Sequence, residues 1–160
     1  MTGTEKISPN LWDYADPFTV SLSVDAADID GLGHTNNVVY VRWCEQVAWA
    51  HSVSLGLDLS AYESLDRAMA ITHSEYRYLQ ASRLSDEVTA ATWIVRWDKR
   101  LTMERRFQIV RNSDGVSLLR GAQRFACIAL QSGRPKRMPP EFVEGYGPAV
   151  REIEDLPPLG

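Results

Sequence analysis

The sequence predicts an α+β fold in which one long apolar helix packs against an antiparallel sheet of about five strands. Three observations predict this fold: a strand-like segment near the N-terminus, one apolar helix-like run directly after it, and four further strand-like segments beyond a break. A chain of 160 residues is long enough to bury a sizeable core. We therefore expect one domain over residues 1–160, with its core at about 18–130.

The period of the apolar residues distinguishes the strands from the helix. Residues 18–24 alternate strictly between apolar and polar side chains, which predicts a strand with one buried face. Residues 38–53 are apolar around most of a helical circumference, which is typical of a helix enclosed by other structure. Further strands are expected at residues 68–79, 87–97, 101–111 and 116–130.

The connections carry turn residues. Residues 97–100 and 112–115 are expected to form tight turns between strands. Gly56 is expected to end the helix, and residues 55–62 to form a break without regular structure. The proline-rich tail after Gly133 is also expected to have little regular structure.

Composition excludes several classes of protein. The net charge of −4 argues against general nucleic-acid binding. No apolar run approaches the roughly 20 residues of a membrane span, and the N-terminal segment does not have the pattern of a signal peptide. We therefore expect a cytoplasmic protein that binds neither nucleic acid nor membrane. The spacing of Cys44 and Cys127 matches no metal-binding pattern, so we expect both to be buried free thiols. The three histidines also lack the spacing of metal ligands, so we expect no metal site.

The segment 28–40 reads Asp-Ile-Asp-Gly-Leu-Gly-His-Thr-Asn-Asn-Val-Val-Tyr and precedes the apolar helix. The free N–H groups of a helix N-terminus can stabilise an oxyanion, while a carboxylate or imidazole beside them can activate water. The same residues are ordinary capping and turn residues, so spacing alone leaves both interpretations open. Gly33 is expected to provide either a positive φ or a close approach of the backbone to a ligand.

On the basis of this motif and the order of the predicted elements, the segment 18–130 resembles hotdog-fold thioesterases of the 4-hydroxybenzoyl-CoA thioesterase type. The most specific part is the motif Asp-x-x-Gly-His-x-Asn-Asn-x-x-Tyr at residues 30–40, followed by Trp43. The Gly-His-x-Asn-Asn form also resembles plant acyl-carrier-protein thioesterases, although Leu32 stands where that family has an asparagine. The resemblance implies a hotdog fold and hydrolysis of an acyl thioester without a metal or redox cofactor.

The resemblance also implies roles for particular residues. Asp30 matches the family's catalytic carboxylate, acting as nucleophile or general base, and the amide that binds the thioester carbonyl aligns near Asn37. His34 would assist as acid or base. Lys99 and Arg100 match basic residues that bind the phosphates of coenzyme A, although Asp98 beside them departs from the pattern.

Other residues of the motif are expected to be structural. Asp28 is expected to stabilise a turn, and Asn36 to cap the helix. Tyr40 and Trp43 are expected in the core or in a pocket wall. The side chains expected to set the acyl pocket are Trp43, Trp49, Met69, Tyr76 and Tyr78.

Basic residues later in the chain allow two interpretations. Lys99, Arg100, Arg105 and Arg106 either bind nucleotide phosphates or belong to a solvated basic rim. His51, late in the helix, is expected to be structural because a cation is favoured there.

The sequence therefore predicts an acyl-CoA thioesterase that uses acyl-CoA as its small-molecule substrate. An acyl-carrier-protein thioesterase and a non-catalytic acyl-CoA-binding module remain alternatives. A hotdog hydratase is disfavoured because no Asn-Pro stands between Asp30 and His34. Since one sheet covers only one side of so apolar a helix, we expect a homodimer or homotetramer.

Overall fold

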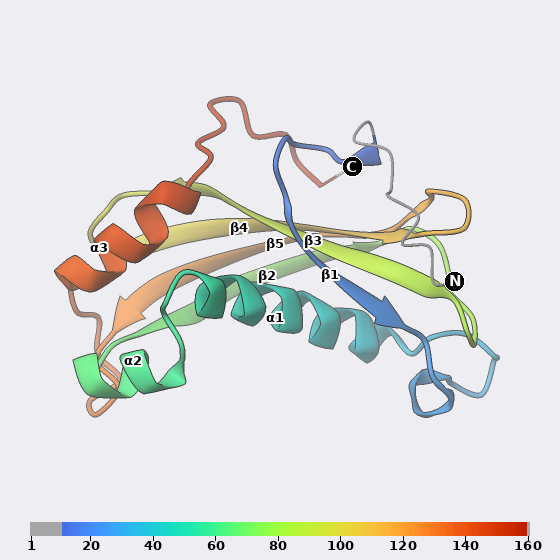
Figure 1. Cartoon of the computed structure of the whole chain (residues 1–160), viewed down its shortest axis with the longest axis horizontal. Helices are drawn as coiled ribbons and strands as arrows, with labels where there is room; N and C mark the ends of the chain where they lie inside the picture. The colour runs from blue at the N-terminus through green and yellow to red at the C-terminus, as the bar shows by residue number, and fades with distance from the viewer. Residues whose placement is uncertain (1–10, 160) are drawn as a thin grey trace.

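The computed structural model describes residues 11–159 and shows one antiparallel sheet packed against a long helix (Figure 1). The strands are β1 (Phe18–Ser23), β2 (Ala68–Tyr78), β3 (Glu87–Trp97), β4 (Thr102–Arg111) and β5 (Ser117–Ile128), in the spatial order β1-β3-β4-β5-β2. The long helix is α1 (Asn37–Ser54). The other described elements are α2 (Leu59–Leu65), α3 (Pro140–Tyr146) and the 3-10 turns η2 (Ala26–Asp28) and η3 (Gly147–Ala149). The predicted α+β class is confirmed.

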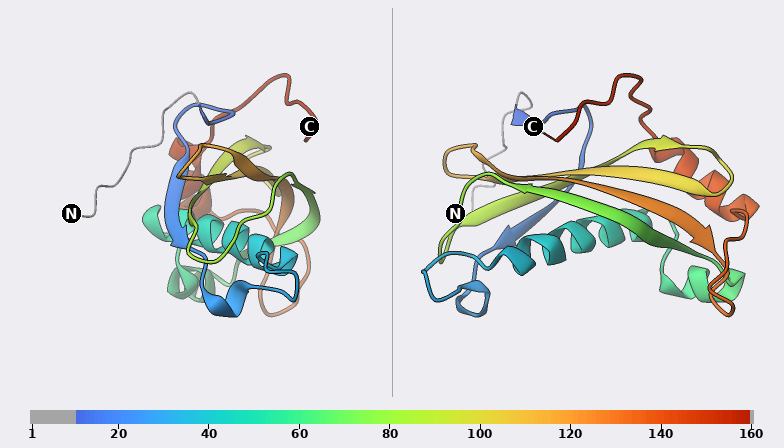
Figure 2. Two further views of the ribbon diagram at one scale, coloured as in Figure 1. Left: turned by 90° about the vertical axis from the view of Figure 1, so that its right-hand side faces the viewer. Right: turned by 180° about the vertical axis from the view of Figure 1, so that it is seen from behind.

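The helix α1 lies along the inner face of the sheet, which curves around it (Figure 2). Val39, Trp43 and Val47 follow each other at intervals of four residues, so they share one face of the helix and are buried against the sheet. Phe107 and Ile109 of β4 belong to the same core. Burying side chains of this size contributes about 1.5–3 kcal/mol each, so these contacts hold the helix against the sheet.

The opposite face of α1 remains open in one protomer. Val38, Trp49 and Val53 on this face are 71%, 41% and 48% exposed. Gly56 has a φ of +80° directly after the helix C-cap, which ends α1 where the sequence predicts.

The outer face of the sheet is covered by the chain's own terminal segments. Trp93 of β3 packs against Trp12 and Tyr14 from the N-terminal side, and against Ile153 from the C-terminal side. The indole N–H of Trp93 donates to the carbonyl of Ala15 at 2.9 Å. The two faces of the sheet are therefore different: one holds α1, and the other holds the termini.

Two predictions about the connections are wrong. Residues 55–62 do not form a simple break, because Asp58 accepts the N–H of Ala61 at 2.8 Å and caps α2. The tail after Gly133 contains α3, which begins at Pro140 because proline is tolerated in the first turn of a helix. Phe142 and Tyr146, four residues apart, bury one side of this short helix.

Candidate functional site

The polar segment before α1 folds as a small closed loop. The backbone N–H of Asp30 donates to the carbonyl of His34 at 2.8 Å, and that of Asn36 donates to the carbonyl of Asp28 at 2.8 Å. Gly33 turns the loop with a φ of +77°, a conformation that side chains rarely adopt, so the predicted positive φ is confirmed. The loop therefore holds Asp30 and His34 opposite each other, just before the helix.

The carboxylate of Asp30 is fixed through one of its two oxygens. Its Oδ1 accepts the backbone N–H of Leu32 at 2.8 Å and that of His34 at 3.2 Å. Its Oδ2 has no hydrogen-bond partner among residues 11–159, and the half-buried side chain keeps contact with solvent. Asp30 therefore closes the turn while one oxygen remains available for another partner. The imidazole of His34 likewise makes no hydrogen bond within the described part of the chain.

The N-terminus of α1 follows directly. Asn36 is the N-cap, and its Oδ1 accepts the N–H of Val38 at 3.1 Å, as expected of a capping residue. Asn37 is the first helical residue and is exposed. Its backbone N–H has no acceptor among the residues that the structure describes. This N–H, at the positive end of an 18-residue helix, is a suitable donor for a carbonyl oxygen.

A buried hydrogen-bond cluster anchors the loop to the β2–β3 connection. The Tyr40 hydroxyl accepts the N–H of Ser82 at 2.9 Å and lies 2.8 Å from the Ser82 hydroxyl. The Thr35 hydroxyl lies 2.6 Å from the same Ser82 oxygen, and the Thr35 N–H donates to the Ser82 carbonyl. Tyr40 is therefore a core residue whose hydroxyl fixes the loop that carries Asp30.

Asp28 is an architectural residue. It is 4% exposed, and its Oδ1 lies 2.6 Å from Arg42 Nη2 in an ion pair within the first turns of α1. Burial acts to raise the pKa of Asp28, but the N–H of Asp25 and the Arg42 guanidinium bind the charged form and lower its pKa overall.

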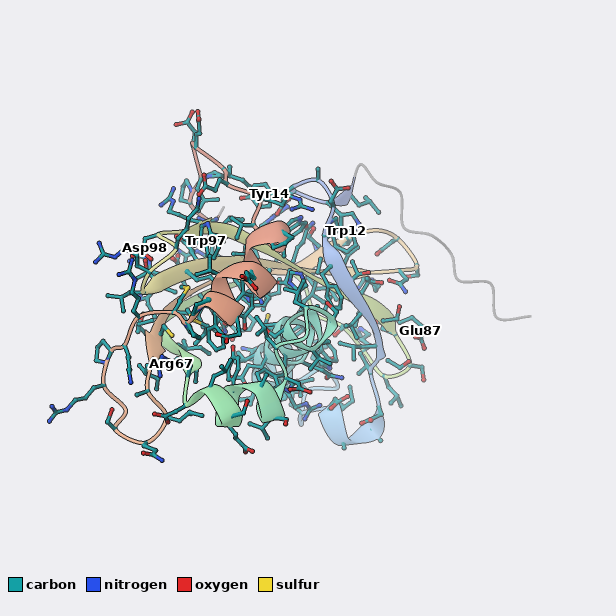
Figure 3. All side chains as sticks on the ribbon, turned by 60° about the vertical axis from the view of Figure 1, so that its left-hand side comes forward. Trp12, Tyr14, Arg67, Glu87, Trp97 and Asp98 are labelled. Carbon is teal, nitrogen blue, oxygen red and sulfur yellow. The ribbon has the colours of Figure 1, made fainter. Side chains whose placement is uncertain are left out.

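Lys99 and Arg100 lie at the opposite end of the sheet from Asp30. They belong to the turn after β3, whereas the Asp30 loop is at the Glu87 end of that strand (Figure 3). The eleven residues of β3 span about 33 Å at the usual rise of a strand. One protomer therefore does not bring the predicted phosphate-binding residues together with the predicted catalytic carboxylate.

Asp98 has a structural role in the turn that carries Lys99. Asp98 Oδ1 accepts the backbone N–H groups of Arg100, Leu101 and Thr102 at 2.8–3.0 Å. These hydrogen bonds favour the charged carboxylate against the opposing effect of burial and lower the pKa of Asp98 to about 2. Asp98 is thus the residue that shapes the turn.

Arg105 and Arg106 are both buried, on opposite faces of the sheet. Arg105 is 3% exposed and Arg106 is 8% exposed, so a solvated basic rim is wrong for these two residues. Neighbouring residues of a strand point to opposite faces of the sheet. Arg105 accordingly faces α1, and Arg106 faces the terminal segments with Tyr14. His51 is buried beside Arg105 and holds a structural position, as expected, but the expected cation is wrong because burial and the neighbouring guanidinium lower the pKa of His51.

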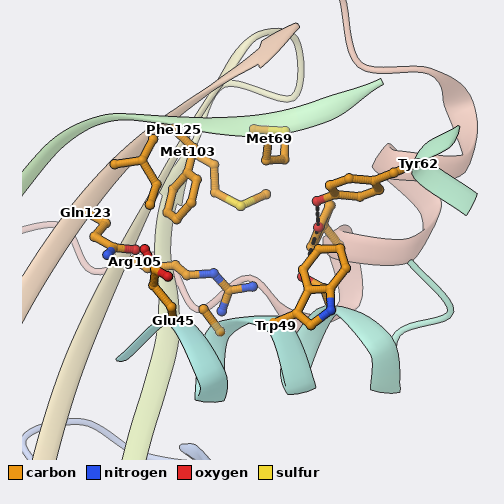
Figure 4. A pocket seen from close by; sticks show the side chains of 12 residues that line it. Glu45, Trp49, Tyr62, Met69, Met103, Arg105, Gln123 and Phe125 are labelled. Carbon is orange, nitrogen blue, oxygen red and sulfur yellow. Dashed lines mark hydrogen bonds between the residues drawn. The ribbon is translucent and has the colours of Figure 1, made fainter. Parts of the chain in front are cut away.

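A cavity of about 250 Å³ lies between the C-terminal half of α1 and strands β2, β4 and β5 (Figure 4). Of the side chains expected to set an acyl pocket, Trp49 and Met69 line this cavity. Trp43 lies in the core, the Tyr76 hydroxyl accepts a hydrogen bond from Gln123 Nε2, and Tyr78 packs edge-on against Tyr40; none of the three lines the cavity.

The cavity is also lined by Arg105, Tyr62 and Tyr146, none of which the sequence placed in an acyl pocket. A signal for Arg105 was present, because the alternation of residues 101–111 places it in the apolar row with Met103 and Phe107. Asp30, His34 and Asn37 do not line this cavity. Trp49 is twelve residues further along α1 than Asn37, which corresponds to about 18 Å along the helix.

Within residues 11–159, no group of three or more His, Cys, Asp or Glu side chains is arranged to hold a metal ion. The helices of the described region include none with the length and apolar character needed to span a membrane. Both cysteines are free and buried, as predicted.

Residues 24–145 match the profile of the thioesterase-like superfamily, so the chain belongs to that family. The chain is 35% identical over 89 residues to protein THEM6 of Danio rerio. This match covers 55% of the chain and 43% of THEM6, so the chain spans less than half the length of this curated relative.

Several solved structures share the fold. Slr0204 of Synechocystis, a 1,4-dihydroxy-2-naphthoyl-CoA thioesterase, is 20% identical with a TM-score of 0.72, covering 79% of this chain and 93% of that one. SAV2348 of Staphylococcus aureus, solved in complex with CoA, is 20% identical with a TM-score of 0.76, covering 86% and 88%. At these identities the likeness establishes the fold, and the predicted hotdog fold is confirmed.

Proposed function

We propose that this protein hydrolyses an acyl-CoA thioester to a free carboxylic acid and coenzyme A, with Asp30 as the catalytic carboxylate. One observation carries the proposal. Asp30 is held by two backbone N–H groups through Oδ1, while Oδ2 has no partner within residues 11–159, and the loop leads directly to the free N–H of Asn37. A fixed carboxylate next to a helix N-terminus supplies both the group that activates water and the donor for an oxyanion.

The chemistry follows one of two routes. As a general base, Asp30 takes a proton from water while the water oxygen attacks the thioester carbon. The carbonyl oxygen becomes negative and accepts the N–H of Asn37, and collapse of the intermediate breaks the C–S bond. The CoA thiolate leaves and takes up the proton. As a nucleophile, Asp30 instead forms a mixed anhydride with release of the CoA thiolate, and water then hydrolyses the anhydride.

A two-fold dimer through the edge strand β2 is the functional unit in this proposal. β2 pairs only with β5, so its other edge is open in the part of the chain that the structure describes. The central residues of β2 are exposed, including Ile71 at 44%. An open edge strand of eleven residues favours pairing with another strand.

Antiparallel pairing of the two β2 edges would complete the site. Tyr40 at the start of α1 contacts Tyr78 at the end of β2, whereas Met69 at the beginning of β2 lines the cavity. Antiparallel strands related by a two-fold axis place the end of one opposite the beginning of the other. The Asp30 loop of one protomer would then lie next to the cavity of its partner, and next to the partner's β3–β4 turn with its basic residues.

In this proposal, different parts of the dimer bind different parts of the acyl-CoA substrate. The acyl group occupies the cavity, the thioester lies between Asp30 and the N-terminus of α1, and Lys99 and Arg100 contact the phosphates of CoA. Both basic side chains are exposed and free to meet phosphate groups.

Asp30→Asn tests the catalytic role with little effect on the loop. The asparagine retains an Oδ1 that accepts the N–H groups of Leu32 and His34, while the negative charge is lost. We expect kcat for thiol release from acyl-CoA to fall by about 10²–10⁴-fold with an unchanged melting temperature. Asp28→Asn is the matched control and should lower stability but retain kcat. Full turnover by Asp30→Asn would remove Asp30 from the mechanism.

The same thiol-release assay separates the alternatives. Faster hydrolysis of acyl groups on acyl carrier protein than on CoA would assign the carrier-protein activity instead. Binding of an acyl-CoA without thiol release would identify a non-catalytic acyl-CoA-binding module.

A further inference from the structure

The cavity beside α1 contains a buried positive charge within mainly apolar walls. Trp49, Met69, Met103 and Phe125 form much of the wall, and the guanidinium of Arg105 extends into the space between them (Figure 4). A cavity of about 250 Å³ has room for about eight water-sized groups, which corresponds to a short acyl chain.

Arg105 has no carboxylate partner within the part of the chain that the structure describes. No ion pair among residues 11–159 includes Arg105, although it is only 3% exposed. Glu45 lines the same cavity and is exposed, and it makes no ion pair with the guanidinium. Burial lowers the pKa of Arg105 to about 10, so the group remains charged at neutral pH. Buried charges are normally paired, which makes this cation exceptional.

The hydrogen bonds of Arg105 leave one edge of the guanidinium unused. Nη1 lies 3.0 Å from His51 Nδ1 and 3.4 Å from Thr92 Oγ1. Nε and Nη2 donate to no acceptor within the described residues. These two groups form the edge with which arginine binds a carboxylate through two parallel hydrogen bonds.

The side chain of Gln123, beside Arg105, has one of its two polar atoms hydrogen-bonded within residues 11–159. Gln123 is paired with Arg105 across strands β4 and β5, and its Nε2 lies 2.7 Å from the Tyr76 hydroxyl. Its Oε1 is buried without a hydrogen bond within residues 11–159, at 1% exposure of the residue. Arg105 and Gln123 each present an unused hydrogen-bonding group to a cavity whose walls are mainly apolar, which indicates a ligand with a polar end.

We infer that the acyl group held in this cavity ends in a carboxylate that pairs with the guanidinium of Arg105. This inference rests on the proposed thioesterase function and names the class of substrate: CoA thioesters of short dicarboxylic acids. The carboxylate neutralises the buried charge, and the methylene chain contacts the apolar wall. A methyl-ended chain of equal length buries the same apolar surface but leaves the cation unpaired.

The preference of the wild-type enzyme is the first test and needs no variant. We expect kcat/KM for adipyl-CoA and suberyl-CoA to exceed that for hexanoyl-CoA and octanoyl-CoA by at least about 10-fold. ω-Hydroxyhexanoyl-CoA, which is polar but uncharged, should fall between the two series. Equal or better hydrolysis of the methyl-ended esters would overturn the inference.

Substitutions of Arg105 test whether this residue causes the preference for carboxylate-ended esters. Arg105→Met should remove the preference for the carboxylate-ended esters, whereas Arg105→Lys should retain part of it because the charge remains. Arg106→Met is the matched control: it removes a neighbouring buried arginine on the opposite face of the sheet and should leave the preference unchanged. If Arg105→Met retained the preference, the carboxylate would be recognised elsewhere and the assignment would be wrong.

A binding measurement separates this inference from the proposed function. Free suberate should bind the wild-type protein and the Asp30→Asn variant in calorimetry, and should bind Arg105→Met at least about 10-fold more weakly. Binding of suberate without hydrolysis of any thioester would retain the carboxylate site and reject the hydrolase. Hydrolysis with no preference and no suberate binding would retain the hydrolase and reject the carboxylate site.

Discussion

The buried pair of His51 and Arg105 predicts how stability depends on pH. An arginine has only donors, so His51 Nδ1 must accept the hydrogen bond from Arg105 Nη1 and the imidazole must be neutral. His51 is 8% exposed and stacks on Phe18 with ring centroids 4.7 Å apart. Burial, followed by the charges of Arg105 and Arg151, lowers the pKa of His51 to about 4 from 6.5.

The depressed pKa means that the unfolded chain binds the proton more readily than the folded protein. Stability should therefore be intact above pH 6.5 and fall as the pH decreases toward 4. The difference between the two pKa values gives a loss of about 2 kcal/mol at pH 5 and about 3 kcal/mol at pH 4 from this group alone.

Substitution of His51 by glutamine isolates this contribution. The amide does not titrate, and its oxygen can still accept from Arg105. We would measure the free energy of unfolding in urea at fixed protein concentration for wild type and His51→Gln between pH 7 and 4. The wild type should lose about 3 kcal/mol more than the variant over this range. His73→Gln, at an exposed position on β2, is the control and should follow the wild type. A constant difference between wild type and His51→Gln would refute the account of a neutral buried imidazole.

Two further predictions concern the anchors of the loops. Tyr40→Phe leaves the buried N–H and hydroxyl of Ser82 without their tyrosine partner. We therefore expect the free energy of unfolding in urea to fall by about 1–3 kcal/mol. An unchanged free energy of unfolding would contradict the anchoring role. Asp98→Ala removes the acceptor of three backbone N–H groups, and since the pKa of Asp98 is lowered to about 2, the wild type should melt at a higher temperature than the variant at pH 7. That difference in melting temperature should decrease as the pH falls from about 4 toward 2, and a difference independent of pH in this range would contradict it.

The main elements of the fold could be predicted because their apolar periods are strong. The strand at residues 87–97 has the predicted bounds, and α1 begins and ends within one residue of the prediction. The short helices α2 and α3 were missed because a seven-residue helix offers too few periods to be distinguished from a loop. Asp58 and Pro140 were the available signals, but capping residues alone also occur in turns.

The site could be predicted only in part because its pieces are distant within one chain. The closed loop that carries the candidate residue Asp30 could be predicted, since neighbours in sequence form that structure. The cavity instead combines α1 with three strands, and the sequence left its cation open between a phosphate-binding residue and a solvated surface charge. The burial of Arg105 depends on α1 covering that face of the sheet, a tertiary contact that the charge of a residue does not reveal.

The most direct test of the account is complementation between two inactive variants. Asp30→Asn removes the carboxylate, and Ala48→Phe fills the cavity that Ala48 lines. If each active site combines Asp30 of one protomer with the cavity of its partner, a mixed dimer contains one intact site. Refolding the variants together in equal amounts should then restore about a quarter of wild-type thiol release, since half of the dimers are mixed and each has one of two sites intact. Activity no higher than the sum of the separate variants would contradict the shared site.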